Sequence, residues 1–294
     1  MMSARFLTVV LERAFNMRDG FGREIDYMRI SVIDSCNLNC YYCNPCDNNE
    51  HCHALNILSV KEVLCIVRAA TRLGIKHFRL TGGEPLLHPQ LDEMVLQIKK
   101  IPGVSSVSLT TNAVLLAQHA KWLKEAGIDS INVSLDTIDA SEYERITKKP
   151  LLEEVKHGIN AAIECGIRVK INVVLTPQTD VVALTRYVAK KGTDIRFIEM
   201  MPVGEGHTNG VEPYKKVIGT LSKLYGEPCR INTEKTKEIN SGNDKRKIPD
   251  NGPAEYYIFP ELGIRVGLIQ AIHGKFCATC NRIRVTADGR LMPC

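Results

Sequence analysis

Three closely spaced cysteines near the N-terminus are the residues of this chain best suited to chemistry. Cys36, Cys40 and Cys43 follow the order C-x3-C-x2-C, directly after an apolar run at residues 28–33 that is typical of a buried strand. Cysteine thiolates hold iron–sulfur clusters, and a cubane cluster has four irons. Three thiolates leave the fourth iron open, where a small molecule can bind and be reduced. The spacing therefore favours redox chemistry on a small ligand.

Two other uses of close cysteines must be weighed. A zinc site stays open, because Cys46 could supply a fourth thiolate. A disulfide framework is disfavoured, because a chain of 294 residues can build its own core. The apolar run at residues 6–11 is interrupted by Glu12 and Arg13, too early for a secretory signal.

A second cysteine group lies at the end of the chain. Cys277, Cys280 and Cys294 are spaced C-x2-C-x13-C, and Arg282 and Arg284 alternate on one face of a predicted strand between them. Guanidinium groups bind phosphate with two parallel hydrogen bonds. This region therefore combines metal-binding side chains with groups that suit an anion.

Composition narrows the class of protein. Hydrophobic content is 44%, charged content is 24% and the net charge is +5, which suits a globular protein and is too mild to predict binding to nucleic acid. No apolar stretch of about 18 residues is present, so no membrane span is expected. Eleven cysteines without a secretory signal indicate a reducing compartment, and we expect a cytoplasmic protein.

A strand followed by a helix recurs from residue 28 to residue 226. Ser59 and Glu62 form a capping-box pattern that starts the first helix. The predicted strands are 28–33, 77–81, 104–110, 130–135, 168–175 and 195–200, and the predicted helices are 59–74, 90–100, 115–126, 152–165, 180–191 and 214–225. Such units predict a parallel sheet, either doubly wound or curved into a partial barrel, with the site at the loops after the strands.

The C-terminal part differs in composition. Residues 231–253 are polar and nearly free of large apolar side chains, which favours a solvated linker. Residues 255–259 and 264–269 are typical of a hairpin, followed by a short strand at 283–286. We therefore predict a barrel domain at residues 1–229, a linker at 230–254 and a small β-containing module at 255–294 that caps the barrel mouth.

The combined motifs resemble the radical S-adenosylmethionine (SAM) superfamily. Tyr42 precedes the last cysteine of the first group, and Gly82-Gly83-Glu84-Pro85 follows the next strand. The second cysteine group, in the setting Phe276-Cys277-x2-Cys280-Asn281-Arg282-x-Arg284, narrows the resemblance to the MoaA family of GTP 3′,8-cyclases. The resemblance covers residues 20–294 and implies a partial (β/α)6 TIM-like barrel.

The resemblance implies a role for each matching residue. Cys36, Cys40 and Cys43 would bind a 4Fe–4S cluster whose open iron chelates SAM, and Cys277, Cys280 and Cys294 would bind a second 4Fe–4S cluster that holds guanine. SAM would be contacted by Tyr42, Gly83, Ser134 and Met201. GTP would be contacted by Arg29, Arg79, Thr110, Lys170, Arg196, Arg282 and Arg284, of which Arg282 and Arg284 would be catalytic.

The implied reaction is the first step of molybdopterin (molybdenum cofactor) biosynthesis. A 5′-deoxyadenosyl radical from SAM removes the 3′ hydrogen of GTP, and the ribose carbon adds to C8 of guanine. The product is (8S)-3′,8-cyclo-7,8-dihydroguanosine 5′-triphosphate. Implied partners are an electron donor such as flavodoxin or ferredoxin, the next enzyme of the pathway and a second copy in a homodimer.

The chain departs from the family pattern at several places. His77 stands where the family usually has Lys in the substrate pocket, and Ser35 precedes the first cysteine where the family usually has Arg. Cys46 and Cys52 are not part of the pattern. Family members continue beyond the position of Cys294 to a Gly-Gly tail, so we expect either a fragment or a divergent relative.

Two other functions compete with GTP cyclisation. One is a radical SAM enzyme with an auxiliary cluster and another substrate, such as a peptide modifier, although a peptide needs no clamp for a triphosphate. The other is a non-enzymatic iron–sulfur or zinc protein, which the Gly-Gly-Glu-Pro loop disfavours.

Overall fold

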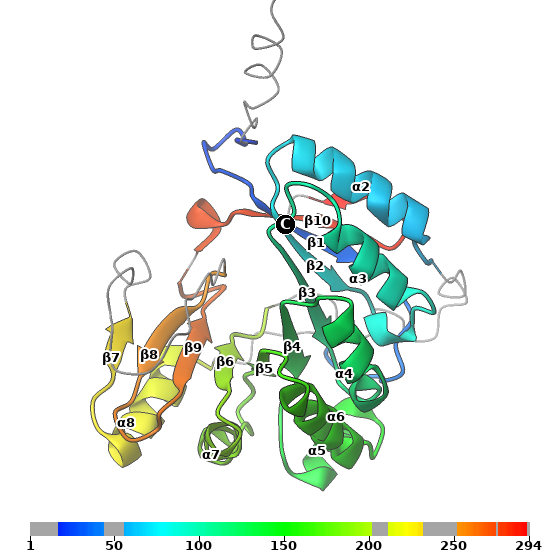
Figure 1. Ribbon diagram of the computed structural model, residues 1–294. Helices are drawn as coiled ribbons and strands as arrows, with labels where there is room; N and C mark the ends of the chain where they lie inside the picture. Colours follow the sequence, from blue (N-terminus) through cyan, green and yellow to red (C-terminus); the bar gives the residue numbers. More distant parts are fainter. Residues whose placement is uncertain (1–16, 44–55, 202–210, 232–251, 275, 293–294) are drawn as a thin grey trace, which may run out of the picture.

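Six parallel strands, paired in sequence order, form the centre of the fold (Figure 1). They are β1 (Tyr27–Ser31), β2 (His77–Thr81), β3 (Ser106–Thr111), β4 (Ser130–Ser134), β5 (Val169–Val174) and β6 (Asp194–Ile198). A doubly wound sheet reverses its strand order at a switch point, and these six strands do not. Because right-handed crossovers that always advance in one direction place every helix on one face, the order confirms the predicted partial barrel.

The computed structural model describes residues 17–43, 56–201, 211–231, 252–274 and 276–292. Helices within these ranges surround the strands on their outer side (Figure 1). They are α2 (Val60–Arg72), α3 (Leu91–Lys99), α4 (Leu116–Glu125), α5 (Ala140–Thr147), α6 (Leu152–Glu164), α7 (Val181–Lys190) and α8 (Gly219–Tyr225), with a π-helical turn at Tyr214–Ile218 before α8. None of these described helices is long and apolar enough to cross a membrane.

Local sequence signals explain where two of these helices begin. The predicted capping box is present at α2, where Ser59 N donates to Glu62 Oε2 (2.8 Å) and Glu62 N donates to Ser59 Oγ (3.3 Å). Helix α5 was not predicted. Its N-cap is Asp139, which accepts a hydrogen bond from Glu142 N (2.8 Å).

The C-terminal strands widen the sheet at both edges. The predicted hairpin is confirmed as β8 (Glu255–Ile258) and β9 (Arg265–Ile269), and β9 runs parallel to β6. At the opposite edge, β10 (Arg282–Val285) runs parallel to β1. Two short strands that were not predicted, β7 (Cys229–Ile231) and β11 (Leu291–Met292), complete the eleven-stranded sheet. The domain limits at residues 229 and 255 stay a prediction, and residues 232–251 of the linker lie outside the described ranges.

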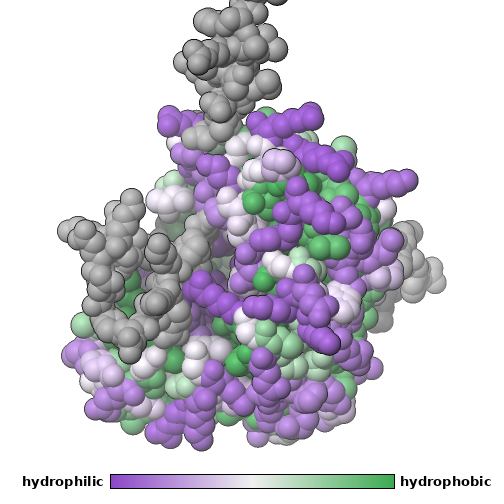
Figure 2. All heavy atoms as spheres, in the orientation of Figure 1, coloured by the Kyte–Doolittle hydropathy of each residue, from purple (hydrophilic) through white to green (hydrophobic). Residues whose placement is uncertain are grey.

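The two faces of the parallel strands have opposite chemistry. Apolar side chains such as Phe78, Leu109 and Phe197 are fully buried against the helices. The helices keep their polar side chains outside, and the face shown in Figure 2 is mostly hydrophilic. The alternate strand positions carry polar or charged side chains, although a closed TIM barrel fills its interior with branched apolar ones. The interior of this barrel is therefore lined by polar side chains that could bind a ligand, and it is not filled by an apolar core.

A candidate active site inside the partial barrel

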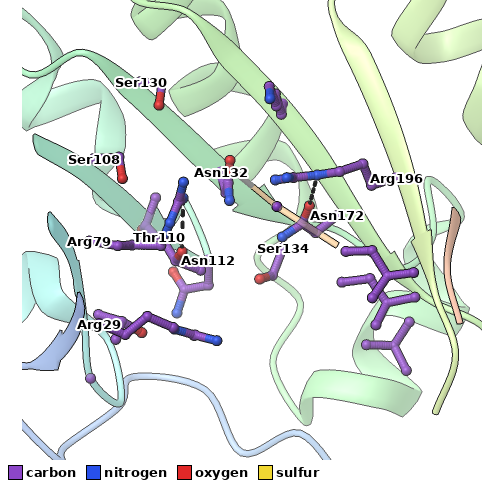
Figure 3. A pocket seen from close by; sticks show the side chains of 18 of the residues that line it. Arg29, Arg79, Ser108, Thr110, Asn112, Ser130, Asn132, Ser134, Asn172 and Arg196 are labelled. Carbon is purple, nitrogen blue, oxygen red and sulfur yellow. Dashed lines mark hydrogen bonds between the residues drawn. The ribbon is translucent and has the colours of Figure 1, made fainter. Parts of the chain in front are cut away.

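A cavity of about 500 Å³ occupies the inside of the barrel. Fourteen of the residues predicted to bind metal, SAM or GTP line it, and several of them are drawn in Figure 3. They are Arg29, Cys36, Cys40, Tyr42, Cys43, Arg79, Gly83, Thr110, Ser134, Lys170, Arg196, Met201, Arg282 and Arg284. The fold therefore gathers side chains from β1 to β6 and from β10 around one space.

The second cysteine group lies next to this cavity. Cys277 and Cys280 are not among its lining residues, whereas the adjacent Phe276 is. The turn that carries them is attached to the start of β1, because Arg23 Nη1 donates to the Cys277 carbonyl oxygen (2.5 Å) and Asn281 Nδ2 donates to Asp26 Oδ1 (2.5 Å). Cys294 lies outside the described residues.

The first cysteine loop is fixed by contacts from three elements. Asn39 N donates to the carbonyl oxygen of Thr147 (3.0 Å) at the end of α5. The Tyr42 hydroxyl donates to Asp136 after β4, and Asp136 also accepts from Val174 N (2.7 Å) in β5. Asn112 after β3 donates to Cys36 Sγ (3.8 Å). The loop is therefore placed at the carboxyl ends of the strands, as expected for this kind of sheet.

The thiols of this loop suit a metal cluster. Burial raises the pKa of Cys36 and Cys43, and burial followed by the charge of Asp136 raises the pKa of Cys40 to about 12. No three His, Cys, Asp or Glu side chains of the described ranges converge as ligands of a single ion would. In a cubane cluster each thiolate binds its own iron, so the sulfur atoms need not converge. Three thiols on one loop that would repel one another's charge once ionised suit a cationic cluster.

The glycines after β2 serve the packing of two loops. A Cβ atom on Gly83 would lie 2.1 Å from the Ser35 carbonyl oxygen, and one on Gly82 would lie 2.3 Å from the Ile33 carbonyl oxygen. Gly83 N donates to Ile33 O (2.7 Å) and Glu84 N donates to Ser35 O (2.8 Å). The resemblance implies that Gly83 contacts SAM, and the structure shows that both glycines approach the backbone that leads into the cysteine loop.

Basic side chains predominate in the cavity. Within the described ranges its basic lining residues are Arg29, Arg79, Arg168, Lys170, Arg196, Arg282 and Arg284, and its acidic ones are Glu84, Asp129 and Asp136. Burial, and then the neighbouring charge of Arg284, lowers the pKa of Arg29 to about 10. Arg29 Nε and Arg282 Nε are buried with no hydrogen-bond partner in the described part of the chain. Buried donors without partners are costly, so the arrangement calls for an anionic ligand.

Sequence reasoning missed several residues that complete this cavity. The Tyr27 hydroxyl accepts from Arg79, and its ring lies 5.3 Å below the guanidinium of Arg282. Asn172 Oδ1 accepts from Arg196 Nε (3.0 Å). Arg168, Asn132 and Ser108 also line the space. The sequence did contain a signal for a polar barrel interior. Polar side chains occupy every second position in β3 and β4, and every second residue of a strand lies on the same face.

Comparison with known proteins gives matches over most of the chain. The Radical SAM superfamily matches residues 30–184 and Molybdenum Cofactor Synthesis C matches residues 193–294. A GTP 3′,8-cyclase from Clostridium perfringens is 37% identical over 281 residues, with 95% of this chain and 83% of the relative covered. A GTP 3′,8-cyclase from Pelotomaculum thermopropionicum is 38% identical, with the same coverage.

Solved structures support the fold. SuiB of Streptococcus suis bound to S-adenosylmethionine aligns with a TM-score of 0.64 and 14% identity, over 92% of this chain and 60% of that protein. At this identity the likeness concerns the fold alone.

Proposed function

This chain belongs to the GTP 3′,8-cyclase family of radical SAM enzymes, and we propose that its cavity converts GTP into (8S)-3′,8-cyclo-7,8-dihydroguanosine 5′-triphosphate. The observation that supports this most is the union, in one cavity, of a three-cysteine loop and a cluster of basic side chains. The cysteines suit a cluster that cleaves SAM, and the basic groups suit a triphosphate. A peptide substrate needs no such cluster of cations, which supports GTP over the peptide-modifying alternative.

The cysteine end of the cavity is proposed to bind SAM. Cys36, Cys40 and Cys43 would hold a 4Fe–4S cluster, and Tyr42, Gly83, Ser134 and Met201, which line the same end, would contact SAM. When bound, this cluster supplies the electron that cleaves SAM to methionine and a 5′-deoxyadenosyl radical. The barrel wall would enclose the two substrates together, which would limit the access of water to a reactive species.

The basic part of the cavity is proposed to bind GTP. Arg29, Arg79, Arg282 and Arg284 come from three adjacent strands and would neutralise the phosphates. Thr110, Lys170 and Arg196 would complete the site. Asn172 and Tyr27 orient two of these guanidinium groups before the ligand arrives, which lowers the entropy lost on binding.

A second 4Fe–4S cluster is proposed at Cys277, Cys280 and Cys294, beside the GTP site. The attachment of its turn to Arg23 and Asp26 supports this, because it fixes the cysteines against the strand that carries Arg29. We further propose that the enzyme is cytoplasmic and that two copies of it form a homodimer. Its partners would be an electron donor such as flavodoxin or ferredoxin and the next enzyme of the molybdopterin pathway.

Metal content tests this proposal directly. Anaerobically reconstituted protein should hold about eight irons per chain, since two cubane clusters have about four each. Replacement of Cys36, Cys40 and Cys43 together by Ala should remove half of the iron and abolish SAM cleavage. Cys65→Ala is the matched control, because Cys65 is exposed on α2 outside the cavity. Iron near four per chain in the unmodified protein, or stoichiometric zinc, would contradict two clusters.

A further inference from the structure

A hydrogen-bonded pair lies at the end of the cavity opposite the cysteine loop. His77 begins β2 and Ser106 begins β3, and the two are register partners across these parallel strands. His77 Nδ1 and Ser106 Oγ lie 2.8 Å apart. Both residues line the cavity, whereas the cysteine loop follows the far end of β1. The roles proposed above assign nothing to this pair, although His77 stands where the family usually has Lys in the substrate pocket.

The pair has the polar groups that a phosphate needs. Because Ser106 engages Nδ1, Nε2 is the ring nitrogen left for a ligand, and it donates whenever the imidazole is protonated. Arg79 follows His77 two residues later on the same face of β2. Arg168 lines the same cavity, and its Nη2 is buried with no hydrogen-bond partner in the described ranges.

The charges around His77 decide its protonation in the ligand-free protein. Burial lowers its pKa, Lys76 lowers it further, and Asp26 and Asp129 raise it. Among the described residues, Tyr27 from β1 and Arg79 from β2 also line the cavity, and the partner of His77 from β3 is the uncharged Ser106. His77 is therefore largely neutral near pH 7, and an anion beside it would favour the imidazolium.

We propose that His77, held by Ser106, is a substrate-binding residue that contacts the phosphate end of the nucleotide and takes up a proton from solvent as it does so. The inference rests on the proposed GTP site and makes substrate affinity depend on pH in this chain. Neutral imidazole would bind the phosphate weakly, and the imidazolium would bind it with a charge-assisted hydrogen bond. Binding should therefore tighten as the pH falls.

Isothermal titration calorimetry of the reconstituted protein with GTP measures this proton uptake. Titrations near pH 7 in two buffers of different ionisation enthalpy give the number of protons bound, and titrations from about pH 6 to about pH 8 give the affinity. We expect the unmodified protein to take up more protons on binding GTP than His77→Gln does. As the pH rises, the GTP affinity of the unmodified protein should fall, relative to that of His77→Gln, by up to about tenfold per pH unit. His157→Gln, an exposed histidine of α6 outside the cavity, should behave as the unmodified protein.

Two further variants keep the proposal falsifiable. His77→Lys carries a fixed charge, so it should bind GTP tightly with no pH dependence beyond that of the nucleotide. Ser106→Ala should reduce the proton uptake without abolishing GTP binding. Equal proton uptake in the unmodified protein and His77→Gln would overturn the role of His77 and leave the GTP site standing. No GTP binding in any of these proteins, with SAM still bound, would overturn both proposals.

Discussion

Arg29 and Arg284 are direct partners across the parallel strands β1 and β10, which come from opposite ends of the chain. The guanidinium of Arg29 is buried whereas Arg284 is exposed, and the lowered pKa of Arg29 reports first its burial and then the neighbouring charge of Arg284. A like charge beside a buried guanidinium disfavours the ligand-free protein, and an anion between the two groups would relieve that repulsion. We therefore expect Arg284 to strengthen the binding of an anion without stabilising the ligand-free protein.

The variant Arg284→Ala should separate the effect of Arg284 on GTP affinity from its effect on the stability of the ligand-free protein. We expect GTP to bind roughly tenfold or more weakly, because a charge-assisted hydrogen bond contributes about 1.5–3 kcal/mol. The melting temperature of the ligand-free protein should stay the same or rise, because a like charge beside Arg29 is removed. Calorimetry and thermal unfolding measure both quantities.

Arg290→Ala is the matched control for that variant. Arg290 lies in the turn after β10, exposed and paired with Asp288 (2.7 Å) outside the cavity. This substitution should leave GTP affinity unchanged. Equal affinity of Arg284→Ala and the unmodified protein, or equal affinity for GTP and ATP, would count against a guanine nucleotide site and favour the peptide-modifying alternative.

Local sequence patterns predicted the central strands and helices, but they did not predict which strands from distant parts of the chain pair with one another. Runs such as 77–81 and the capping box at Ser59 carry their own signal, because period and capping are properties of a few neighbouring residues. The pairing of β10 with β1 depends on contacts between distant segments, so the neighbourhood of Arg29 and Arg284 could not be predicted from spacing. Arg168 was missed for the same reason, since it immediately precedes β5 and only the curvature of the sheet brings it to the cavity.

Tyr42→Phe should loosen the cysteine loop. The Tyr42 hydroxyl donates to Asp136, whose burial raises the pKa of its carboxyl to about 6. Loss of the hydroxyl leaves a buried carboxylate oxygen without that partner, which costs about 1–3 kcal/mol of unfolding free energy. SAM should bind more weakly, as measured by calorimetry on reconstituted protein. Tyr41→Phe is the control, because Tyr41 is an exposed neighbour, and equal SAM affinities in the two variants would contradict an anchoring role.

The thiol of Cys40 should react slowly in the metal-free protein. The thiolate is the reactive form, and a pKa raised from about 9 to about 12 lowers its population at neutral pH by roughly a thousandfold. The labelling rate should increase with pH, because a raised pKa keeps the thiol protonated, and therefore unreactive, up to a higher pH. Iodoacetamide labelling followed by mass spectrometry should show a rate that rises through pH 10, with Cys65 as the exposed reference. Labelling of Cys40 at the rate of Cys65 near pH 7.5 would show that the surroundings of the Cys40 thiol do not raise its pKa.

Glu199→Ala should affect the second cysteine group and spare the first. Glu199 is buried just after β6, where its Oε2 accepts from Ile272 N (2.8 Å) and His273 N (3.1 Å), and it also pairs with the His273 ring. These contacts fix the loop that leads from β9 to Phe276 and Cys277, so their loss should free that loop. We expect reconstituted Glu199→Ala to hold about four irons per chain instead of about eight, with SAM cleavage retained at the first cluster. Glu261→Ala, in the exposed turn before β9, should keep all of the iron. Full iron content in Glu199→Ala, or loss of SAM cleavage with the second cluster intact, would show that the contacts of Glu199 do not position the second cysteine group.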